Sequence, residues 1–313
     1  MRIYKSTLRL KSASGTPWQA DTLFGHCCWS IVRHKGPDFL MNVFFAEYRR
    51  GKPPVLISDG FPSGWLPRPL GVKRNDREAL LPKAERIRRY RTIKDELEAH
   101  WLTIEEFNQA RHGDFVQPKS QPHSAIRIVV KNQIDRLTNT AGAVYDFTEL
   151  YLPEVDVYWR LAEGYEELVR DFLASLLNTG YGKRKSVGYG HVESFTFEAF
   201  DKFPTIPEPN GFVTLSSFVP DGADPKDGFW KTTVKYGKLG EEGAVASQPF
   251  KRPLIQLTAG SCFYDVPVRE WYGRLIESLT TDPNVVHYGY AFPVSLRLPE
   301  KEKGEVDEHF LSC

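Results

Sequence analysis

Apolar positions near the N-terminus change from a two-residue spacing to a helical one. Met1–Leu10 alternates between polar and apolar residues, which predicts a β-strand. After a short loop, apolar residues recur at i, i+4 and i+7 between Phe24 and Ile31. This spacing predicts a helix that buries one stripe of its surface and ends at Gly36. A second amphipathic helix is expected over Asp38–Arg49.

The middle of the chain predicts the remaining elements of a βαββαβ order. Gly and Pro are dense between Ser58 and Leu70, which predicts irregular backbone there. Further strands are expected at Val55–Ile57, Ala125–Lys131, Val155–Leu161 and His191–Phe200, a hairpin at Asn132–Leu152 with Gly142 near its tip, and a helix at Tyr165–Asn178. The order strand, helix, insert, strand, strand, helix, strand is typical of a ferredoxin-like core that carries a large insert.

The last third of the chain is rich in predicted strands. A Pro-rich linker runs from Phe203 to Gly211. The expected strands lie near Phe212–Val219, Lys231–Tyr236, Leu254–Thr258, Ser261–Val266 and Gly289–Leu298, and a helix is expected near Arg269–Leu279. No clear repeat of the first half is visible, although a degenerate second copy is possible. The charged tail from Pro299 is expected to fray.

Composition narrows the class of protein. The 313 residues are 41% hydrophobic and 13% aromatic, which is enough to fill a core. No apolar run is long enough for a membrane span, and the first residues lack the apolar core of a signal peptide. Two adjacent cysteines and two isolated ones do not predict disulfides or a zinc site. We therefore expect a soluble cytoplasmic protein without a metal or another cofactor.

The net charge of +1 hides a strong asymmetry. Residues 1–94 hold 19 Lys and Arg against 7 Asp and Glu, and acidic residues are in excess in the rest. Ten of these cations lie between Arg68 and Lys94. A basic surface on a nearly neutral protein indicates a polyanion or an acidic partner, although a solvated helix face is the simpler interpretation of a charge run.

A Gly-rich basic loop between the last predicted helix and strand of the first half is the most informative segment. It contains four glycines and three consecutive cations within Gly180–Gly190. Glycines let the backbone approach a phosphate closely, and the cations supply countercharge. Tyr181 and Tyr189 could stack on bases. The segment runs from helix to strand, so it is neither a P-loop nor a Rossmann turn. Nucleic-acid backbone binding explains it better than a mobile connection does.

Catalytic groups are sparse in the sequence. There is no Walker sequence, nucleophile elbow or paired-histidine metal motif. His26 is expected to face outward near the start of its helix, where it could contact an anionic ligand. Asp135 and Asp146 flank the hairpin without the spacing of a metal pair. The alternative to a binding protein is a metal-independent RNA-processing endoribonuclease with His26 as general acid or base.

Five segments together resemble a known family. They are Gln19–Trp29; Ser58–Pro62 with Leu66–Pro69; Asn132–Arg136 with Glu149–Tyr151; Gly180–Gly190; and Pro249–Pro253 followed by Ala259–Phe263. Their order and spacing are similar to the family of subunit four of the Csm complex, which are RAMP-superfamily proteins of type III-A CRISPR effectors. One departure is Gly60, where the family's motif leads us to expect Ala; we expect the change to be harmless.

The resemblance implies an α+β fold of two ferredoxin-like, RRM-like domains. The first would span residues 1–202, with a basic helical insert at about 71–120 and a thumb hairpin at about 132–152, and the second, β-rich and degenerate, residues 203–313. Members of this family cap the 5′ handle of the crRNA and contact the large polymerase/nuclease subunit and a backbone RAMP subunit. Their thumb lies near the target RNA, and target cleavage belongs to another subunit.

Residues of this chain at the matching positions are the candidate contacts. Those expected to bind RNA are Gly25, His26, Asn132, Gln133, Arg136, Gly180, Tyr181, Gly182, Lys183, Arg184, Lys185, Ser186, Gly188 and Tyr189. Contacts to RNA or to a partner are expected at Asp59, Phe61, Arg68, Lys251 and Arg252. The sequence and the resemblance thus predict a non-catalytic, crRNA-binding scaffold of an antiviral defence complex, with no catalytic residue, metal or membrane contact.

Overall fold

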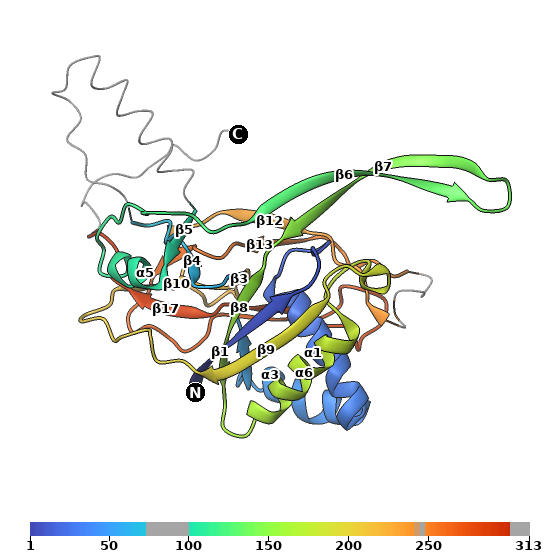
Figure 1. Ribbon diagram of the computed structural model, residues 1–313. Helices are drawn as coiled ribbons and strands as arrows, with labels where there is room; N and C mark the ends of the chain where they lie inside the picture. The colour runs from blue at the N-terminus through green and yellow to red at the C-terminus, as the bar shows by residue number, and fades with distance from the viewer. Residues whose placement is uncertain (73–99, 242, 244–247, 301–313) are drawn as a thin grey trace, which may run out of the picture.

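The computed structural model describes residues 1–72, 100–241, 243 and 248–300 (Figure 1). Most of the expected basic insert, residues 73–99, lies outside the described residues, so its helices stay a prediction. The described part is a mixed α/β structure whose strand pairs are all antiparallel. Among the described residues, no helix is long and apolar enough to cross a membrane.

The first sheet combines strands from two parts of the chain, residues 2–62 and residues 154–199. Its strand order is β2-β8-β1-β9, and the short β3 also pairs with β8. The strands are β1 (Arg2–Leu10), β2 (Val55–Ile57), β3 (Phe61–Pro62), β8 (Glu154–Leu161) and β9 (Val192–Ala199). Along the chain, this sheet and its two long helices follow the order strand, helix, strand, strand, helix, strand, with a long insert between β2 and β8.

Two helices cover the sheet with apolar stripes. These are α1 (Ala20–Lys35) and α6 (Glu166–Thr179), which lie side by side in Figure 1 and contact each other. Phe24 and Ile31 of α1 are buried, as their helical spacing predicts, and so is Phe172 of α6. Phe172 packs against Trp159 of β8, with ring centroids 5.8 Å apart. The hydrophobic core therefore lies between this helix pair and β8-β1.

The second predicted helix is broken into three pieces. α2 (Pro37–Phe39) leads into a π-helical turn, η1 (Leu40–Phe44), and then into α3 (Phe45–Arg49). The insert contributes β4 (Trp65–Pro67), β5 (Trp101–Thr103) and α5 (Ile104–Ala110), with β4 paired to β5. α5 begins with a capping box, in which Glu106 N donates to Thr103 Oγ1 at 3.2 Å and Thr103 N donates to Glu106 Oε2 at 3.0 Å.

A long two-stranded ribbon projects from the body of the molecule (Figure 1). β6 (Ala125–Asp135) pairs only with β7 (Thr140–Tyr151) in the described structure, through a bulge after Asn132. The hairpin therefore begins at Ala125 rather than at Asn132. The expectation that Ala125–Lys131 supplies the second strand of the main sheet is wrong, because β2 takes that place. The β-branched residues of β6 are largely exposed and form no core.

The last third of the chain forms a second sheet, of four strands, and two further ribbons. The sheet has the order β11-β14-β10-β17. Its strands are β10 (Gly211–Thr214), β11 (Gly228–Phe229), β14 (Cys262–Tyr264) and β17 (Pro293–Leu296); the ribbons pair β12 (Thr232–Lys235) with β13 (Leu254–Leu257) and β15 (Gly273–Ile276) with β16 (His287–Tyr290). The helix expected near Arg269–Leu279 is wrong: Gly273 has φ +81°, which ends any helix there, and the following residues pair with β16.

One short connection, η3 (Lys185–Val187), completes the described elements and lies in the loop between α6 and β9. The principal hydrophobic cluster contains residues from both halves of the chain, including Trp159 of β8 and Tyr288 of β16. The Tyr288 hydroxyl oxygen also accepts a hydrogen bond from Ile57 N of β2 at 2.9 Å. The two halves therefore share one packed interior.

We expect Gly60→Ala to destabilise the fold, because a Cβ at this position would lie 2.6 Å from Trp18 Cβ and 2.7 Å from Val155 Cγ1. Overpacking of this kind costs about 1–3 kcal/mol of unfolding free energy. Urea unfolding followed by circular dichroism would measure the loss. The control is Gly25→Ala, since no heavy atom lies within 4 Å of a Cβ there. Equal midpoints for Gly60→Ala and the wild type would contradict this account of the packing.

Candidate nucleic-acid interface

The Gly-rich loop, Gly180–Gly190, is folded tightly between α6 and β9. Two of its glycines are required by close contacts as well as by their positive φ angles. At Gly190 (φ +61°) a Cβ would lie 2.1 Å from Tyr181 O, and at Gly182 (φ +75°) it would lie 2.8 Å from Thr16 Cβ. The two glycines therefore allow two stretches of backbone to pack against each other. A solvated, mobile loop would not need such close contacts.

The loop that joins β1 to α1 holds the Gly-rich loop in place. Gly190 N donates to Ala13 O at 2.8 Å, and Lys183 N donates to Thr16 Oγ1 at 3.0 Å. The Tyr181 hydroxyl donates to Pro17 O at 2.7 Å. The Tyr181 ring stacks on Trp18, with centroids 3.8 Å apart. These contacts come from residues that are close in space only because β1 and β9 are neighbours.

The expectation that Tyr181 offers a face to a base is wrong. Its side chain is fully buried, and the ring is covered by Trp18 on one side and approached by His26, whose ring centroid is 5.3 Å away. Burial also raises the pKa of the Tyr181 hydroxyl well above its usual value. Tyr181 therefore anchors the loop to the core and does not present it to a ligand.

His26 points into the structure and not outward as expected. Its Nε2 accepts a hydrogen bond from Gly182 N at 3.1 Å. Burial, together with the nearby cations Lys185 and Arg33, lowers the pKa of His26 to about 4, against the opposing effect of Glu241. Because the Nε2 lone pair is taken by a backbone amide, His26 is a neutral acceptor that positions the loop.

The three consecutive cations of the loop have different surroundings. Lys183 and Arg184 are exposed, and within the described residues neither forms an ion pair with a carboxylate. Lys185 turns toward the second half of the chain and pairs with Glu241, which also pairs with Arg33 at 3.0 Å. The charge of Lys185 is thus largely compensated within the protein, while the charges of the other two face solvent.

The exposed cations gather on the root of the β6–β7 ribbon. Lys183 Nζ and the Arg184 guanidinium lie 5.0 Å and 4.9 Å from the ring centroid of Phe147 in β7, and Lys131 Nζ of β6 lies 4.6 Å from it. Cation–π contacts of this length are favourable. Three cations around one ring also repel one another, so this root cluster (Lys131, Phe147, Lys183 and Arg184) favours an added anion.

Tyr189 joins the root cluster from the end of the Gly-rich loop. Its ring meets Phe147 edge-on at 5.1 Å, and its hydroxyl donates to Glu149 Oε1. Glu149 also pairs with Lys131 at 3.4 Å. Sequence reasoning missed Lys131, Phe147 and Glu149, although the alternation of β7 places Phe147 and Glu149 on one face. Their chemistry becomes visible only once the loop is seen to pack on that face.

The other expected RNA contacts are spread along the ribbon and beside the loop. Asn132 and Gln133 lie at the bulge of β6, and Arg136 lies in the turn at the tip, all exposed. The structure therefore does not bring Arg136 together with the Gly-rich loop, since the ribbon holds it at the far end (Figure 1). Gly25 is exposed on α1. Ser186 and Gly188 are exposed beside Lys183 and complete the outer surface of the loop.

Two of the five expected RNA or partner contacts are structural. Asp59 is buried: its Oδ1 accepts from Ala20 N at 2.8 Å, and its Oδ2 accepts from Ser217 N at 3.1 Å and from Ser217 Oγ at 2.8 Å. Burial raises the pKa of Asp59 to about 6. Phe61 is also buried in the core. The expectation of surface contacts at these two residues is wrong.

The remaining three lie at or near the surface. Arg68 donates from Nη2 to Val116 O at 3.1 Å, and its guanidinium lies 4.5 Å from the ring centroid of Phe115. Lys251 donates from Nζ to Val286 O at 2.8 Å, and burial lowers its pKa. Arg252 is exposed. Of these three, Arg252 is the most accessible to a ligand.

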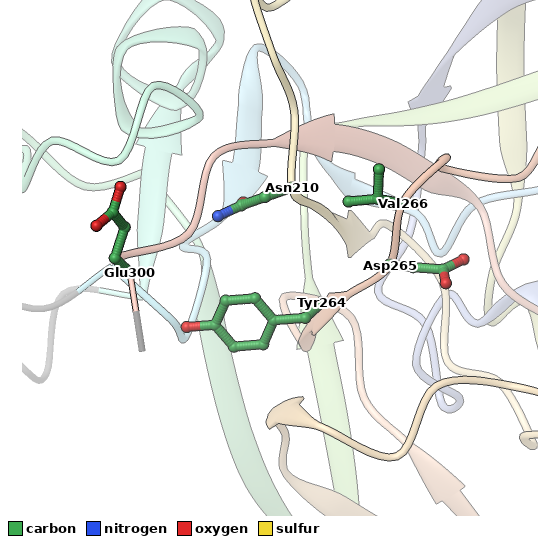
Figure 2. A pocket seen from close by; sticks show the side chains of 5 residues that line it. All are labelled: Asn210, Tyr264, Asp265, Val266 and Glu300. Atoms are coloured by element: carbon green, nitrogen blue, oxygen red, sulfur yellow. The ribbon is translucent and has the colours of Figure 1, made fainter. Parts of the chain in front are cut away.

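Other parts of the described chain offer little for chemistry. The described residues contain no group of three or more His, Cys, Asp or Glu side chains that could hold a metal ion. A shallow cavity of about 520 Å³ is lined by Asn210, Tyr264, Asp265, Val266 and Glu300 (Figure 2). None of the candidate residues from the sequence lines this cavity. The five residues that line it form no arrangement of a nucleophile with a general base. The candidate site is therefore the Gly-rich loop with the root cluster.

We expect His26→Gln to remove a pH-dependent contribution to stability. The folded-state pKa of His26 lies below its unfolded value of 6.5, so its contribution is fully present above pH 6.5 and is lost as the pH falls toward about 4. The wild type should therefore lose about 1–3 kcal/mol relative to the variant over this range. Urea unfolding of both proteins at several pH values would measure the difference. A difference that does not change with pH would contradict the buried, neutral state of His26.

Comparison with known proteins agrees with the motifs. No family model matches the chain. The CRISPR system Cms protein Csm4 of Streptococcus thermophilus is 23% identical over 271 residues, which cover 82% of this chain and 84% of that protein. The fold of this chain is similar to that of a chain in a Csm1-Csm4 cassette crystallised with cA4 (TM-score 0.65, 21% identity). It is also similar to that of a chain in a Csm3-Csm4 subcomplex of the type III-A interference complex (TM-score 0.60, 11% identity). Each match covers 96% of this chain and 100% of the other. In sequence and in fold, this chain is therefore similar to Csm4 over most of its length, and the resemblance indicated by its five motifs is confirmed.

Proposed function

We propose that this chain is a non-catalytic RNA-binding and scaffold subunit of a type III-A CRISPR effector complex that caps the 5′ handle of the crRNA. The observation that carries the proposal is the pair of exposed cations, Lys183 and Arg184, held over Phe147 beside a loop that is fixed to the core. A rigid loop with exposed cations suits a phosphodiester chain, since the protein loses little conformational freedom on binding.

The ribbon β6–β7 is the proposed thumb, which would lie near the target RNA. Its root contacts the Gly-rich loop through Tyr189, so the two elements would meet the same RNA. The solved chains of similar fold come from complexes with Csm1 and with Csm3. By analogy, we propose that this chain contacts the large polymerase-like subunit and a backbone RAMP subunit in the cytoplasm.

The proposed domain division follows the two larger sheets, of five and of four strands. The first domain, residues 1–202, would be a ferredoxin-like module, which the order β2-β8-β1-β9 supports. The second, residues 203–313, would be a degenerate copy. The shared interior between the halves supports a rigid pair of domains rather than a flexible one.

The alternative of an endoribonuclease that uses His26 receives no support from the geometry. A general base needs a lone pair that can reach the substrate proton. The Nε2 of His26 is engaged by Gly182 N, and its pKa is lowered to about 4, away from neutral pH. We therefore assign His26 to positioning the loop, in a subunit without its own nuclease activity.

We expect the triple variant Lys183→Ala, Arg184→Ala and Lys185→Ala to bind a 5′-handle RNA more weakly and with a flatter salt dependence. Each phosphate contact that is lost should reduce the slope of log affinity against log salt by about 0.7 on a single strand. Because Lys185 is paired with Glu241, the change should correspond to about two contacts. Filter binding at several salt concentrations would measure affinity and slope together.

A matched control removes the same number of cations elsewhere, at Lys52, Lys119 and Lys202, which are all exposed. This control should change the affinity much less than the loop variant does. Unchanged affinity and slope in the loop variant, with folding intact, would overturn the proposed function. Equal losses in both variants would also count against it, since they would indicate a net-charge effect without a site.

A further inference from the structure

The ribbon β12–β13 carries an exposed aromatic face in the last third of the chain. Along the first strand and its extension, Thr232, Val234, Tyr236 and Lys238 are exposed, while the intervening residues are half-buried. Val234 pairs with Ile255, and Lys238 pairs with Phe250 through an isolated bridge. We call the part of this exposed side that holds Tyr236, Lys238 and Phe250 the aromatic face; the aliphatic pair Val234 and Ile255 lies beside it on the ribbon. Tyr236 is 75% exposed and Phe250 is 68% exposed.

The charges of this ribbon are of one sign. The segments 230–240 and 249–260 contain five Lys and Arg and no Asp or Glu. The inward-facing Lys235 binds Gln19, Asp21 and Thr22 of the α1 start. The outward cations Lys238 and Arg252 are exposed, and Lys238 Nζ lies 5.6 Å from the Phe250 ring centroid. The aromatic face therefore combines accessible rings with positive charge, and the first carboxylate after segment 230–240, Glu241, is paired with Lys185 and Arg33.

The aromatic face lies next to the Gly-rich loop. Leu239 N donates to Pro249 O at 2.8 Å, so the ribbon continues past β12 toward Glu241. Glu241 then pairs with Lys185 of the Gly-rich loop and with Arg33 of α1. The ion pairs thus join the end of the ribbon directly to the loop that carries the exposed cations Lys183 and Arg184.

We propose that the aromatic face is a second binding site, for single-stranded RNA that continues from the Gly-rich loop, with Tyr236 and Phe250 as stacking platforms for its bases. The proposal rests on the proposed function, because the loop supplies the first contact with the same strand. Phe250 bridges Lys238, which lies two residues after Tyr236 on the same exposed side, so the two rings are on adjacent segments of the ribbon. Rings beside cations are typical of sites that hold single strands without reading their sequence.

Charge decides between RNA and a protein partner for this face. An apolar protein partner would pack on Val234 and Ile255, and it would form no favourable electrostatic interaction with Lys238 or Arg252. A ribonucleotide strand uses both parts, since its bases stack on rings and its phosphates meet cations. The absence of carboxylates from the two described strand segments, 230–240 and 249–260, also suits a polyanion.

The test uses the full chain and two fluorescein-labelled single-stranded RNAs with the same 5′ end, of about 6 and about 16 nucleotides, which bracket the length one binding module covers. Tyr236→Ala with Phe250→Ala should weaken binding of the long RNA by at least about fivefold per ring and leave the short RNA nearly unchanged. Tyr236→Phe with Phe250→Tyr keeps both rings and should bind both RNAs as the wild type does.

A second control, Val234→Ala with Ile255→Ala, removes aliphatic surface from the ribbon beside the aromatic face, touches neither ring nor cation, and should leave both RNA affinities unchanged. Crosslinking of the long RNA, carrying 4-thiouridine beyond its first nucleotides, should map to Tyr236 and Phe250. If the loop variant at residues 183–185 weakens binding but the loss of the two rings does not, the inference is overturned while the proposed function stands. If the wild type binds neither RNA, the proposed function itself fails.

The remaining outcome concerns a protein partner. If the aliphatic control weakens copurification with other subunits, while the loss of the two rings leaves long-RNA affinity and crosslinking unchanged, the aromatic face is a protein-binding surface. That result would overturn the inference. It would leave the assignment of the Gly-rich loop intact, because the loop variant is measured with the short RNA.

Discussion

The short loop between β1 and α1 is the point on which the functional surface depends. Its backbone and side chains accept hydrogen bonds from Gly190 N and Lys183 N of the Gly-rich loop. Ser14 exchanges two backbone hydrogen bonds with Leu150 of β7, at 2.8 and 2.9 Å. Trp18 O accepts from Gly60 N at 2.7 Å. One segment therefore fixes the cationic loop, the root of the ribbon and the turn after β2 relative to one another.

Burial decides which side chains near this loop can act on a ligand. Tyr181 and Asp59 are buried and His26 is half-buried. Each forms hydrogen bonds within the protein, and desolvation shifts its pKa. Asp59 is of special value because Gln19, the residue before α1, gives no side-chain cap, and the Asp59 carboxylate accepts from Ala20 N in its place. The carboxylate also binds Ser217, so the same contact joins the start of α1 to the second half of the chain.

The same packing also decides which cations of the Gly-rich loop face solvent. Lys185 is turned inward to Glu241, whereas Lys183 and Arg184 stay over Phe147 in solvent. Phe147 in turn requires Gly15, where a Cβ would lie 2.6 Å from its ring. Two ribbons, β6–β7 and β12–β13, carry exposed apolar side chains from this region. Isolated two-stranded ribbons gain little stability by themselves, so exposed rings and aliphatic side chains on them indicate surfaces that serve binding.

Local spacing of residues determined much of the secondary structure. The alternation of Met1–Leu10, the helical stripe of α1 and the capping box at Thr103 each depend on neighbours within a few residues, and the structure has all three. The Gly-rich loop was also visible, because four glycines and three cations within eleven residues are a local pattern. The five motifs similarly identified the relationship to Csm4, which needs only their order along the chain.

Tertiary packing decided the rest. Strand partners far apart in sequence gave β2 the place expected for Ala125–Lys131, and pairing with β16 overrode the helical composition of Arg269–Leu279. Burial likewise turned Tyr181 and His26 inward and brought Phe147 beneath Lys183. The sequence by itself determined which residue types lie within one turn or strand of each other. Only the folded chain decided which of them face solvent, because exposure depends on contacts between segments that are not neighbours in the sequence.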